Sequence, residues 1–276
     1  MRIGISNLAW EREHDAAVAS ILRNAGVDAI DVVPGRYFED TAKVSESEVT
    51  QVRRWWSDSG FRIFGMQSLL FGTKGLNIFG SAEAQTQMLE HLAAIARVAA
   101  LLGATRLTFG SPRNRDRSGW ENDAAHDHAV RFFRRLAQVG RQHDVCFCLE
   151  PNPPGYQCNF MTTTEEAAAV VRAVGEPQIL LQLDTGALAA NAEDAAAVIP
   201  AHQDIVGHIH ASEPNLAPLG SGVTDHRQYG AIIQAVLPDR MVTIEMLPGA
   251  DRLAAVCKAA ELALARYGSA QGAGNT

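Results

Sequence analysis

The sequence has 276 residues, of which 47% are hydrophobic and 20% are charged, and its formal net charge is −7. This length and apolar content predict one large core, and α/β barrels of this size often form a single domain. The acidic balance disfavours nucleic-acid-binding proteins, whose grooves need concentrated Lys and Arg. Four cysteines are too few for a disulfide scaffold, and the sequence contains no apolar run of about 18 residues. We therefore expect a soluble cytoplasmic protein that binds neither nucleic acid nor membranes.

A strand-then-helix rhythm starts at the N-terminus. Apolar or alternating runs predict strands at residues 3–6, 29–33, 62–67 and 105–109. The helices predicted to follow them are residues 13–24, 45–59, 81–102 and 122–143. Gly26, Gly60 and Gly103 stand where three of these helices should end, and Ser45 and Glu48 have the spacing of a capping box.

The rhythm continues to the end of the chain. The next strands are predicted at residues 146–150, 180–184, 207–210 and 242–245. Their helices are predicted at residues 163–174, 192–199, 226–236 and 251–267. Eight strand-helix units predict a single (β/α)8 TIM barrel over residues 1–267, followed by a flexible C-terminal tail at residues 268–276. A doubly wound parallel sheet is the competing fold.

The last four predicted strands each end in a side chain that can bind a metal ion. These side chains are Glu150, Asp184, His210 and Glu245. The 34, 26 and 35 positions between them are close to the roughly 30 residues of one βαβ unit. Each candidate therefore occupies the same place on a successive strand, which would bring all four to one mouth of a barrel.

Side-chain parity supports this arrangement, because successive residues of a strand face opposite sides. The positions on the same face as the four candidates are polar or small: Cys146, Cys148, Gln182, His208 and Thr243. The other face is large and apolar: Phe147, Leu149, Leu181, Leu183, Ile209 and Ile244. We expect the first face to line the barrel interior and the second to pack under the helices.

The four candidates have the composition of a metal site. Two Glu, one Asp and one His provide oxygen ligands and one imidazole, a set suited to Mn²⁺, Mg²⁺ or Co²⁺ and also compatible with Zn²⁺. Three carboxylates buried in one mouth would repel each other strongly without a cation. We therefore expect one divalent metal ion, with Mn²⁺ as the first choice.

Four short motifs resemble those of the xylose-isomerase-like TIM barrels, a family often labelled sugar phosphate isomerase/epimerase. They are LEPN at 149–152, LDTG at 183–186, GHIH at 207–210 and IE at 244–245. The segment GVDAID at 26–31 is similar to the second-strand pattern of the family, with Asp31 where a Glu is common. The resemblance covers nearly the whole chain and is greatest to the ketose 3-epimerase branch.

That resemblance implies roles for the four candidates. In the ketose 3-epimerase branch the matching residues bind the metal, and the two matching Glu also exchange the substrate proton. The branch usually has a His three positions after the sixth-strand Asp and an Arg shortly after the seventh-strand His. This chain has Ala187 at the first place and no Arg in residues 212–217, so the resemblance does not identify the substrate. Relatives commonly form homodimers or homotetramers.

Glu150 and Glu245 suit a proton-transfer reaction. Strands five and eight are three steps apart in an eight-stranded ring, so the two carboxylates should approach a substrate from separate directions. One can remove a proton α to a carbonyl and the other return it through an enediolate, which predicts a sugar or polyol epimerase or isomerase. The alternatives are a dehydratase of a cyclic polyol or keto-sugar, an endonuclease IV-like nuclease and a non-catalytic sugar-binding barrel.

Other residues near the predicted strand ends are candidates for substrate contact: Trp10, Gln67, Arg113, Glu213 and Asn215. Trp10 could instead pack in the core, Arg113 belongs to a loop that could simply be solvated, and Asn215 could form a turn. We expect His208, two residues deeper than His210, to be a hydrogen-bonded neighbour of the site and not a metal ligand.

Overall fold

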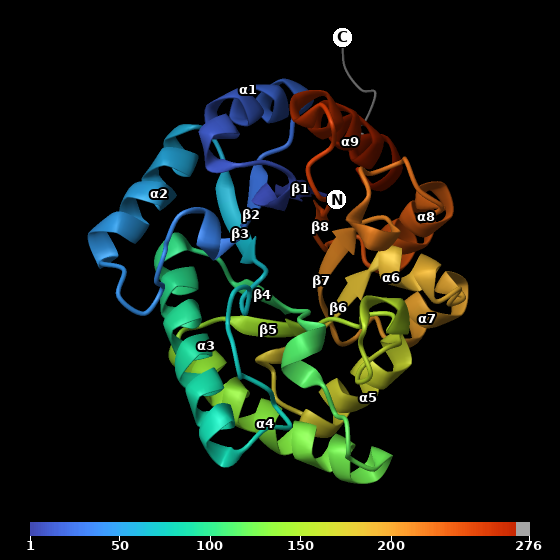
Figure 1. Ribbon diagram of the computed structural model, residues 1–276. Coiled ribbons are helices and arrows are strands. Elements are labelled where there is room, and N and C mark those ends of the chain that lie inside the picture. Colours follow the sequence, from blue (N-terminus) through green and yellow to red (C-terminus); the bar gives the residue numbers. More distant parts are fainter. Residues whose placement is uncertain (269–276) are drawn as a thin grey trace.

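A closed barrel of eight parallel strands forms the centre of the computed structural model, which describes residues 1–268 (Figure 1). The strands are β1 (Ile3–Ser6), β2 (Ala29–Val32), β3 (Arg62–Met66), β4 (Arg106–Phe109), β5 (Cys146–Leu149), β6 (Ile179–Asp184), β7 (Val206–Ala211) and β8 (Val242–Ile244). Each strand pairs with the next, and β8 pairs with β1. The predicted (β/α)8 barrel is confirmed.

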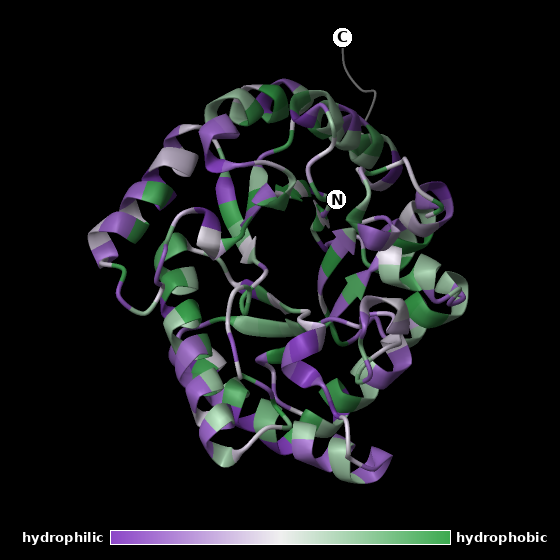
Figure 2. Cartoon of the chain, in the orientation of Figure 1, coloured by the Kyte–Doolittle hydropathy of each residue, from purple (hydrophilic) through white to green (hydrophobic). Residues whose placement is uncertain are grey.

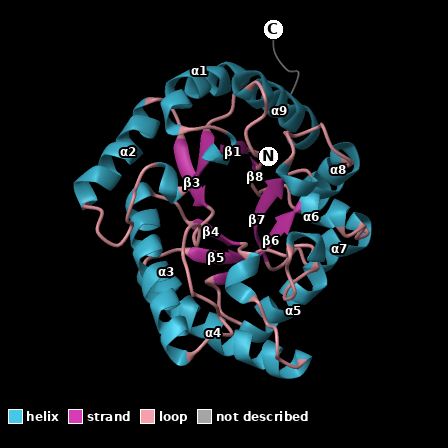
Figure 3. Cartoon of the chain, viewed as in Figure 1, coloured by secondary structure: helices cyan, strands magenta, loops and turns pink. Residues whose placement is uncertain are grey.

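Helices surround the barrel as an outer ring (Figure 3). The α-helices in residues 1–268 are α1 (Asp15–Ala25), α2 (Glu46–Asp58), α3 (Ala82–Leu102), α4 (Asn122–Gln142), α5 (Thr164–Val174), α6 (Thr185–Ala190), α7 (Ala195–Ala201), α8 (His226–Val236) and α9 (Arg252–Tyr267). The predicted helices agree to within three residues at each end, and the capping box of Ser45 and Glu48 is present. Helix α6 was not predicted.

Short 3-10 helices occupy many of the loops that leave the strands. They are η1 (Asn7–Ala9), η2 (Arg12–His14), η3 (Pro34–Arg36), η4 (Pro112–Arg115), η5 (Pro154–Tyr156) and η6 (Pro214–Leu216). Four of them have Pro at a first helical position, where its fixed φ favours a turn of helix and its missing N–H is not needed. These turns build the mouth at the carboxyl ends of the strands.

The two faces of the strands differ as predicted. Hydrophobic and hydrophilic residues alternate along the surrounding helices, which are therefore amphipathic (Figure 2). On the outer face, Phe109 of β4 packs edge-on against Phe133 of α4, with ring centroids 5.3 Å apart. On the inner face, Thr108 donates a hydrogen bond to Gln182 Oε1 across the interior at 3.2 Å. Apolar burial thus fixes the helices, and polar side chains remain inside the barrel.

Two register shifts aim polar side chains within the barrel. One lies between Ile30 and Asp31 where β2 meets β3, and the other between Leu181 and Gln182 where β6 meets β7. A bulge of this kind re-aims the side chains that follow it. A Cβ atom at Gly65, which pairs with Asp31, would lie 2.7 Å from the Asp31 carboxylate. The absence of a side chain at Gly65 therefore makes room for a carboxylate inside the barrel.

Helix α9 ends at Tyr267, and the predicted flexible tail lies, apart from Gly268, outside the described residues. Within residues 1–268, every helix is too short or too polar to cross a lipid bilayer.

Candidate metal centre and active site

Four strands bring one ligand each to the mouth of the barrel. Glu150 follows β5, Asp184 ends β6, His210 lies in β7 and Glu245 follows β8, and all four are buried. One atom from each side chain lies within 4.8 Å of the others. The four residues predicted from the sequence are therefore adjacent in space.

The imidazole of His210 lies between the two glutamates. Its Nδ1 atom is 3.3 Å from Glu150 Oε1 and 3.2 Å from Glu245 Oε2. Neither His210 Nδ1 nor Glu150 Oε1 has a hydrogen-bond partner, although both are buried. Buried polar atoms normally have partners, so these two atoms are suited to bind a ligand at the centre of the cluster.

The remaining carboxylate oxygens are held by neighbouring donors. Gln67 Nε2 donates to Glu245 Oε1 at 2.6 Å, and Asn152 Nδ2 donates to Glu150 Oε2 at 3.3 Å. Asp184 accepts from the Ser212 hydroxyl on Oδ2 at 2.7 Å and from the first turn of α6 on Oδ1. Each glutamate is thus oriented by an amide through one oxygen and directs its other oxygen into the cluster.

The three carboxylates of this cluster outnumber its one imidazole. Burial and then repulsion by Glu150 and Glu245 raise the pKa of Asp184 to about 7. For His210, burial alone would lower the pKa, but the surrounding carboxylates, Glu245 foremost, outweigh it and raise the pKa well above its ordinary value. The cluster therefore retains protons when no cation compensates it, and a divalent cation would displace them.

The donor chemistry fits a divalent metal ion. Three carboxylates and one imidazole form a mainly hard, oxygen-rich set that suits Mn²⁺ or Mg²⁺ and can also hold Zn²⁺. Together with the orphaned atoms of Glu150 and His210, this composition makes the cluster a candidate metal centre.

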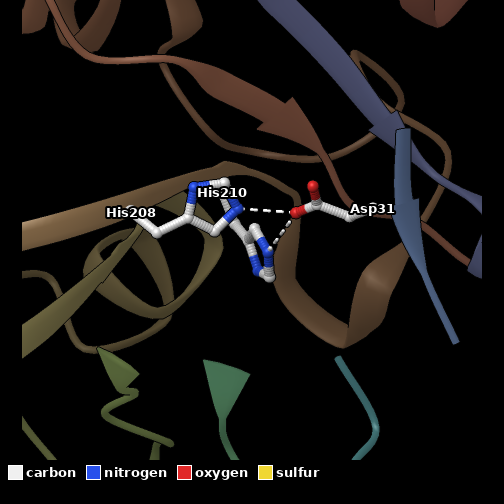
Figure 4. Close-up of side chains that lie close together, drawn as sticks. All are labelled: Asp31, His208 and His210. Carbon is white, nitrogen blue, oxygen red and sulfur yellow. Dashed lines mark hydrogen bonds and ion pairs between the residues drawn. The ribbon is translucent and has the colours of Figure 1, made fainter. Parts of the chain in front are cut away.

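A second buried group lies directly behind the metal-competent face of His210. Figure 4 shows the imidazoles of His208 and His210 both turned toward the carboxylate of Asp31. Asp31 Oδ2 is 2.6 Å from His208 Nε2 and 3.8 Å from His210 Nε2. Burial alone would raise the pKa of Asp31, but the two imidazoles hold it well below its ordinary value.

The ionised Asp31 can only accept hydrogen bonds, which constrains both histidines. His208 must donate its Nε2–H to Asp31, and burial lowers the pKa of His208, so that this ring is neutral. The same carboxylate lies 3.8 Å from His210 Nε2 and favours a proton on that nitrogen by its charge. Nδ1, which faces Glu150 and Glu245, is therefore the nitrogen that a metal ion would bind after displacing its proton. His208 thus supports the site from behind.

A cavity of about 450 Å³ opens above the cluster, within the range of roughly 300–1,000 Å³ typical of small-molecule sites. Of the predicted substrate contacts, Gln67, Glu213 and Asn215 line this cavity. Asn215 lies there with a left-handed φ of 59°, and its backbone N–H donates to the Tyr156 hydroxyl at 2.7 Å.

Two predicted contacts lie elsewhere. Trp10 is fully buried in the core, where its indole donates to Asp15 at 2.7 Å and its ring packs against Trp56. Leu8 lines the cavity in its place, because η1 turns the chain before Trp10. Arg113 is exposed and does not line the cavity. Both expectations of substrate contact are corrected: Trp10 packs in the core, and Arg113 belongs to the solvated part of its loop.

The other two arginines of the β4–α4 loop donate hydrogen bonds to backbone carbonyl groups. Arg115 is fully buried and donates to the Glu150 carbonyl at 2.7 Å. Arg117 donates to the Asn159 carbonyl at 2.6 Å. Neither lines the cavity, so this arginine-rich loop positions the segment around Glu150.

Several cavity residues were not identified from the sequence. They are mainly loop residues: Leu69, Leu70, Phe71, Tyr156, Leu216 and Leu247. An apolar residue in a loop has no periodic neighbours that would mark its direction, so only the folded loops show where these side chains point. Asn152 could have been found, since an amide two residues after a ligand can reach the same carboxylate.

The comparisons with known proteins agree with this architecture. A family model described as xylose isomerase-like TIM barrel matches residues 19–261. No curated protein sequence matches the chain significantly.

Among solved structures, a D-psicose 3-epimerase in the presence of D-fructose is 17% identical, with a TM-score of 0.81 over 98% of this chain and 100% of that chain. A D-allulose 3-epimerase from Methylomonas sp. in complex with D-allulose is 20% identical, with a TM-score of 0.77 over 97% of each chain.

A third solved structure, the IOLI protein with a binding zinc atom, is 13% identical. Its TM-score is 0.74 over 97% of this chain and 98% of that chain. At these identities the likeness concerns the fold, while the family model spans most of the sequence. The chain belongs to the xylose isomerase-like TIM barrel family.

Proposed function

We propose that this protein is a divalent-metal-dependent sugar or polyol epimerase or isomerase, in which Glu150 and Glu245 transfer a proton α to a carbonyl. One observation carries the proposal. The two carboxylates flank one cavity, each is oriented by a neighbouring amide, and each directs a free oxygen toward His210 Nδ1.

Glu150 and Glu245 are oriented in the same way, each by a neighbouring amide, but follow different strands, β5 and β8. Either carboxylate can accept the proton from a carbon between them, and the other can return it from the opposite side. Return to the same carbon inverts its configuration, whereas return to the neighbouring carbon interconverts an aldose and a ketose. Gln67 and Asn152 would hold the carboxylates in place during the transfer, because each donates to the oxygen that does not face the cluster.

Glu150, Asp184, His210 and Glu245 would hold the metal ion, with Mn²⁺ as the first candidate and Mg²⁺, Co²⁺ or Zn²⁺ as alternatives. When bound, the ion would polarise the carbonyl and thereby make the adjacent proton more acidic. Asp184 and His210 then serve as fixed ligands, since neither has the free carboxylate oxygen that the two glutamates offer. Several structural neighbours are named as ketose 3-epimerases, which supports ketoses as the first substrates to test.

The test is solvent deuterium incorporation, followed by NMR, into a panel of ketoses, aldoses, inososes and sugar acids with and without Mn²⁺. We expect metal-dependent label on the carbon beside the carbonyl, together with a new stereoisomer or positional isomer. Glu150→Gln and Glu245→Gln should each lower the exchange rate by at least about 100-fold, in the range of general acid–base contributions. Glu90→Gln is the matched control, because Glu90 is exposed on α3.

The outcomes separate the competing reactions. Near-normal turnover of either glutamine variant would refute the assigned proton transfer. Loss of water from a cyclic polyol or keto-sugar, without epimer formation, would assign a dehydratase.

A further inference from the structure

The cavity has two chemically different ends. Its floor carries the carboxylates of Glu150, Asp184 and Glu245, while apolar side chains from three loops form its wall and rim. These side chains are Leu69, Leu70 and Phe71 after β3, Leu216 after β7 and Leu247 after β8. Phe71 is 87% exposed and Leu247 is 45% exposed, although both line a cavity beside the candidate active site. Large apolar side chains exposed around a cavity are typical of a ligand-binding surface.

The loop backbone holds this apolar wall in an unfavourable conformation. Leu216 has a φ of 55° and Ser68, at the start of the loop that carries Phe71, has a φ of 56°. Branched or polar residues without glycine's freedom rarely adopt this left-handed region, and strained residues of this kind cluster at functional sites. Both residues line the cavity. The strain therefore supports a role for the wall in binding and not only in packing.

The side chains that line the cavity disfavour an anionic substrate. Among the described residues, none that lines it is Lys, Arg or His. A divalent ion would leave the three carboxylates of the floor with one net negative charge. Glu213 adds a fourth carboxylate, which is already occupied by the backbone N–H groups of Gly220 and Thr224 and by His226. A phosphate or carboxylate on the substrate would thus be repelled by the acidic floor, with no cationic side chain among the described lining residues to pair with it.

From these contrasts we infer that the substrate is an uncharged sugar that carries an apolar group at the end remote from its reacting carbonyl. The carbonyl end would lie on the floor, against Glu150 and Glu245, and the apolar end would cover Phe71, Leu216 and Leu247. In chemical terms this is a deoxy sugar or an alkyl- or aryl-substituted sugar. The inference rests on the proposed function, whose substrate class it narrows.

A matched series of ketoses tests the inference. D-Fructose, 6-deoxy-D-fructose, 6-O-benzyl-D-fructose and D-fructose 6-phosphate, with the same series built on D-psicose, differ only at the carbon remote from the carbonyl. Deuterium exchange with the Mn²⁺-loaded protein should be fastest, by kcat/KM, for a deoxy or benzyl compound, by about tenfold or more over the free sugar. The gain should appear mainly in KM, and the phosphate should be the poorest member.

Two substitutions by serine test whether the preference for apolar substrates depends on the cavity wall. Phe71→Ser removes an exposed side chain that lines the cavity, so it should reduce the preference for the apolar compounds over the free sugar by about fivefold or more. Val223→Ser is the matched control, because Val223 is 80% exposed in the β7–α8 loop but does not line the cavity. The control should keep the wild-type preference.

Measurements of exchange and of binding together distinguish a wrong substrate class from a wrong reaction. A preference for the phosphate, equal rates for all members, or an unchanged preference in Phe71→Ser would overturn the inference and leave the proposed function intact. If no member exchanges, saturation-transfer NMR measures binding of the same compounds. Tighter binding of the apolar members, lost in Phe71→Ser, would then uphold the inference while the proposed proton transfer fails. Absence of binding by both apolar members would overturn the inference.

Discussion

Gly110, the residue that follows β4, lies directly against Glu150. A methyl group at this position would overlap Glu150 Oε2. Because that oxygen is at the end of a flexible side chain, the fold can accept Gly110→Ala, but the carboxylate must move from its present position and strain its hydrogen bond with Asn152. We expect a nearly unchanged melting temperature and a deuterium-exchange rate at least about 100-fold lower, since displacements of about 1 Å can cost that much.

Gly155→Ala provides the matched control for that substitution. Gly155 also lies in a mouth loop, but nothing lies within 4 Å of the position that its Cβ would take. This variant should keep both stability and exchange. Full activity in Gly110→Ala would show that the position of Glu150 in this structure is not the reactive one.

Asp31 lies behind the two barrel histidines, and its charge favours the Nε2 proton of His210 and so the use of Nδ1 as the metal-binding nitrogen. In Asp31→Asn the charge is lost, and the amide can present a donor to either imidazole. We expect Mn²⁺ affinity to fall by about 10–100-fold, the usual effect of removing such a supporting partner. Competition with a chelator, followed by the electron paramagnetic resonance of free Mn²⁺, measures the change.

Asp28→Asn is the control for Asp31→Asn. Asp28 immediately precedes β2 and forms an exposed ion pair with Arg2 at 2.9 Å, so its loss should change metal affinity little. Circular dichroism would establish that the barrel is intact in both variants. Equal Mn²⁺ affinity in Asp31→Asn and the wild type would contradict the positioning role.

The residues that could be predicted from the sequence share one property: their direction follows from the local chain. Glu150 and His210 lie at strand ends, where parity fixes the face and the parallel barrel fixes the end. Trp10 and Arg113 were placed incorrectly because they lie beyond the strand ends, where a single turn decides between cavity, core and solvent. The position of Asp31 beside the histidines depends on the register shift between β2 and β3 and on Gly65 of β3. The sequence around Asp31 alone reveals neither feature.

At the scale of elements, Glu213 anchors the loop between β7 and α8. It accepts from Gly220 N at 3.0 Å, Thr224 N at 2.9 Å and His226 Nε2 at 3.1 Å. His226 in turn lies 2.6 Å from the hydroxyl of Tyr267, the last residue of α9. One buried carboxylate thus joins the loop to two helices.

Glu213→Gln should lower the free energy of unfolding by about 1–3 kcal/mol at pH 7, because the amide cannot accept all three hydrogen bonds as the carboxylate does. Burial alone would raise the pKa of Glu213, but the hydrogen bonds from Thr224 and the proximity of His226 hold it below its ordinary value. Its stabilisation is therefore complete above a pH of about 4.5 and is lost as the pH falls through the lowered pKa. Urea denaturation at pH 7 and below pH 4 measures this.

The difference in free energy of unfolding between Glu213→Gln and the wild type should therefore become smaller as the pH is lowered. Glu90→Gln, an exposed change on α3, should unfold like the wild type at both pH values. A difference that stayed constant with pH would mean that the ionised carboxylate does not anchor the loop.

Most elements could be predicted because their signals are local. The capping box at Ser45 and the left-handed Gly103 at the end of α3 fix helix boundaries through contacts within a few residues. Helix α6 was missed because it has only six residues and follows directly on Asp184, whose side chain both caps the helix and belongs to the candidate metal centre. The two register shifts depend on neighbouring strands and leave no mark in either strand alone.

At the scale of the whole molecule, the four metal-competent residues come from four consecutive strands, β5 to β8, and so connect half of the barrel at one end. Three carboxylates and one imidazole crowd this end of the barrel, where burial and repulsion by Glu150 and Glu245 raise the pKa of Asp184 to about 7. Metal binding and barrel stability should therefore be linked, and both should depend on pH.

Mn²⁺ at 100 times its dissociation constant should stabilise the folded barrel by about 2.7 kcal/mol, which for a chain of this size is a rise of roughly 5 °C in melting temperature. Protons compete for Asp184 and His210, whose pKa values are raised, so the rise should be largest above pH 7 and should shrink as the pH falls toward 5. Calorimetry with Mn²⁺ or with a chelator, at pH 8 and pH 5, measures it. Asp184→Asn removes one ligand and should lose most of the rise, whereas Asp28→Asn should keep it. An equal rise at both pH values, or in Asp184→Asn, would place the stabilising ion outside this cluster.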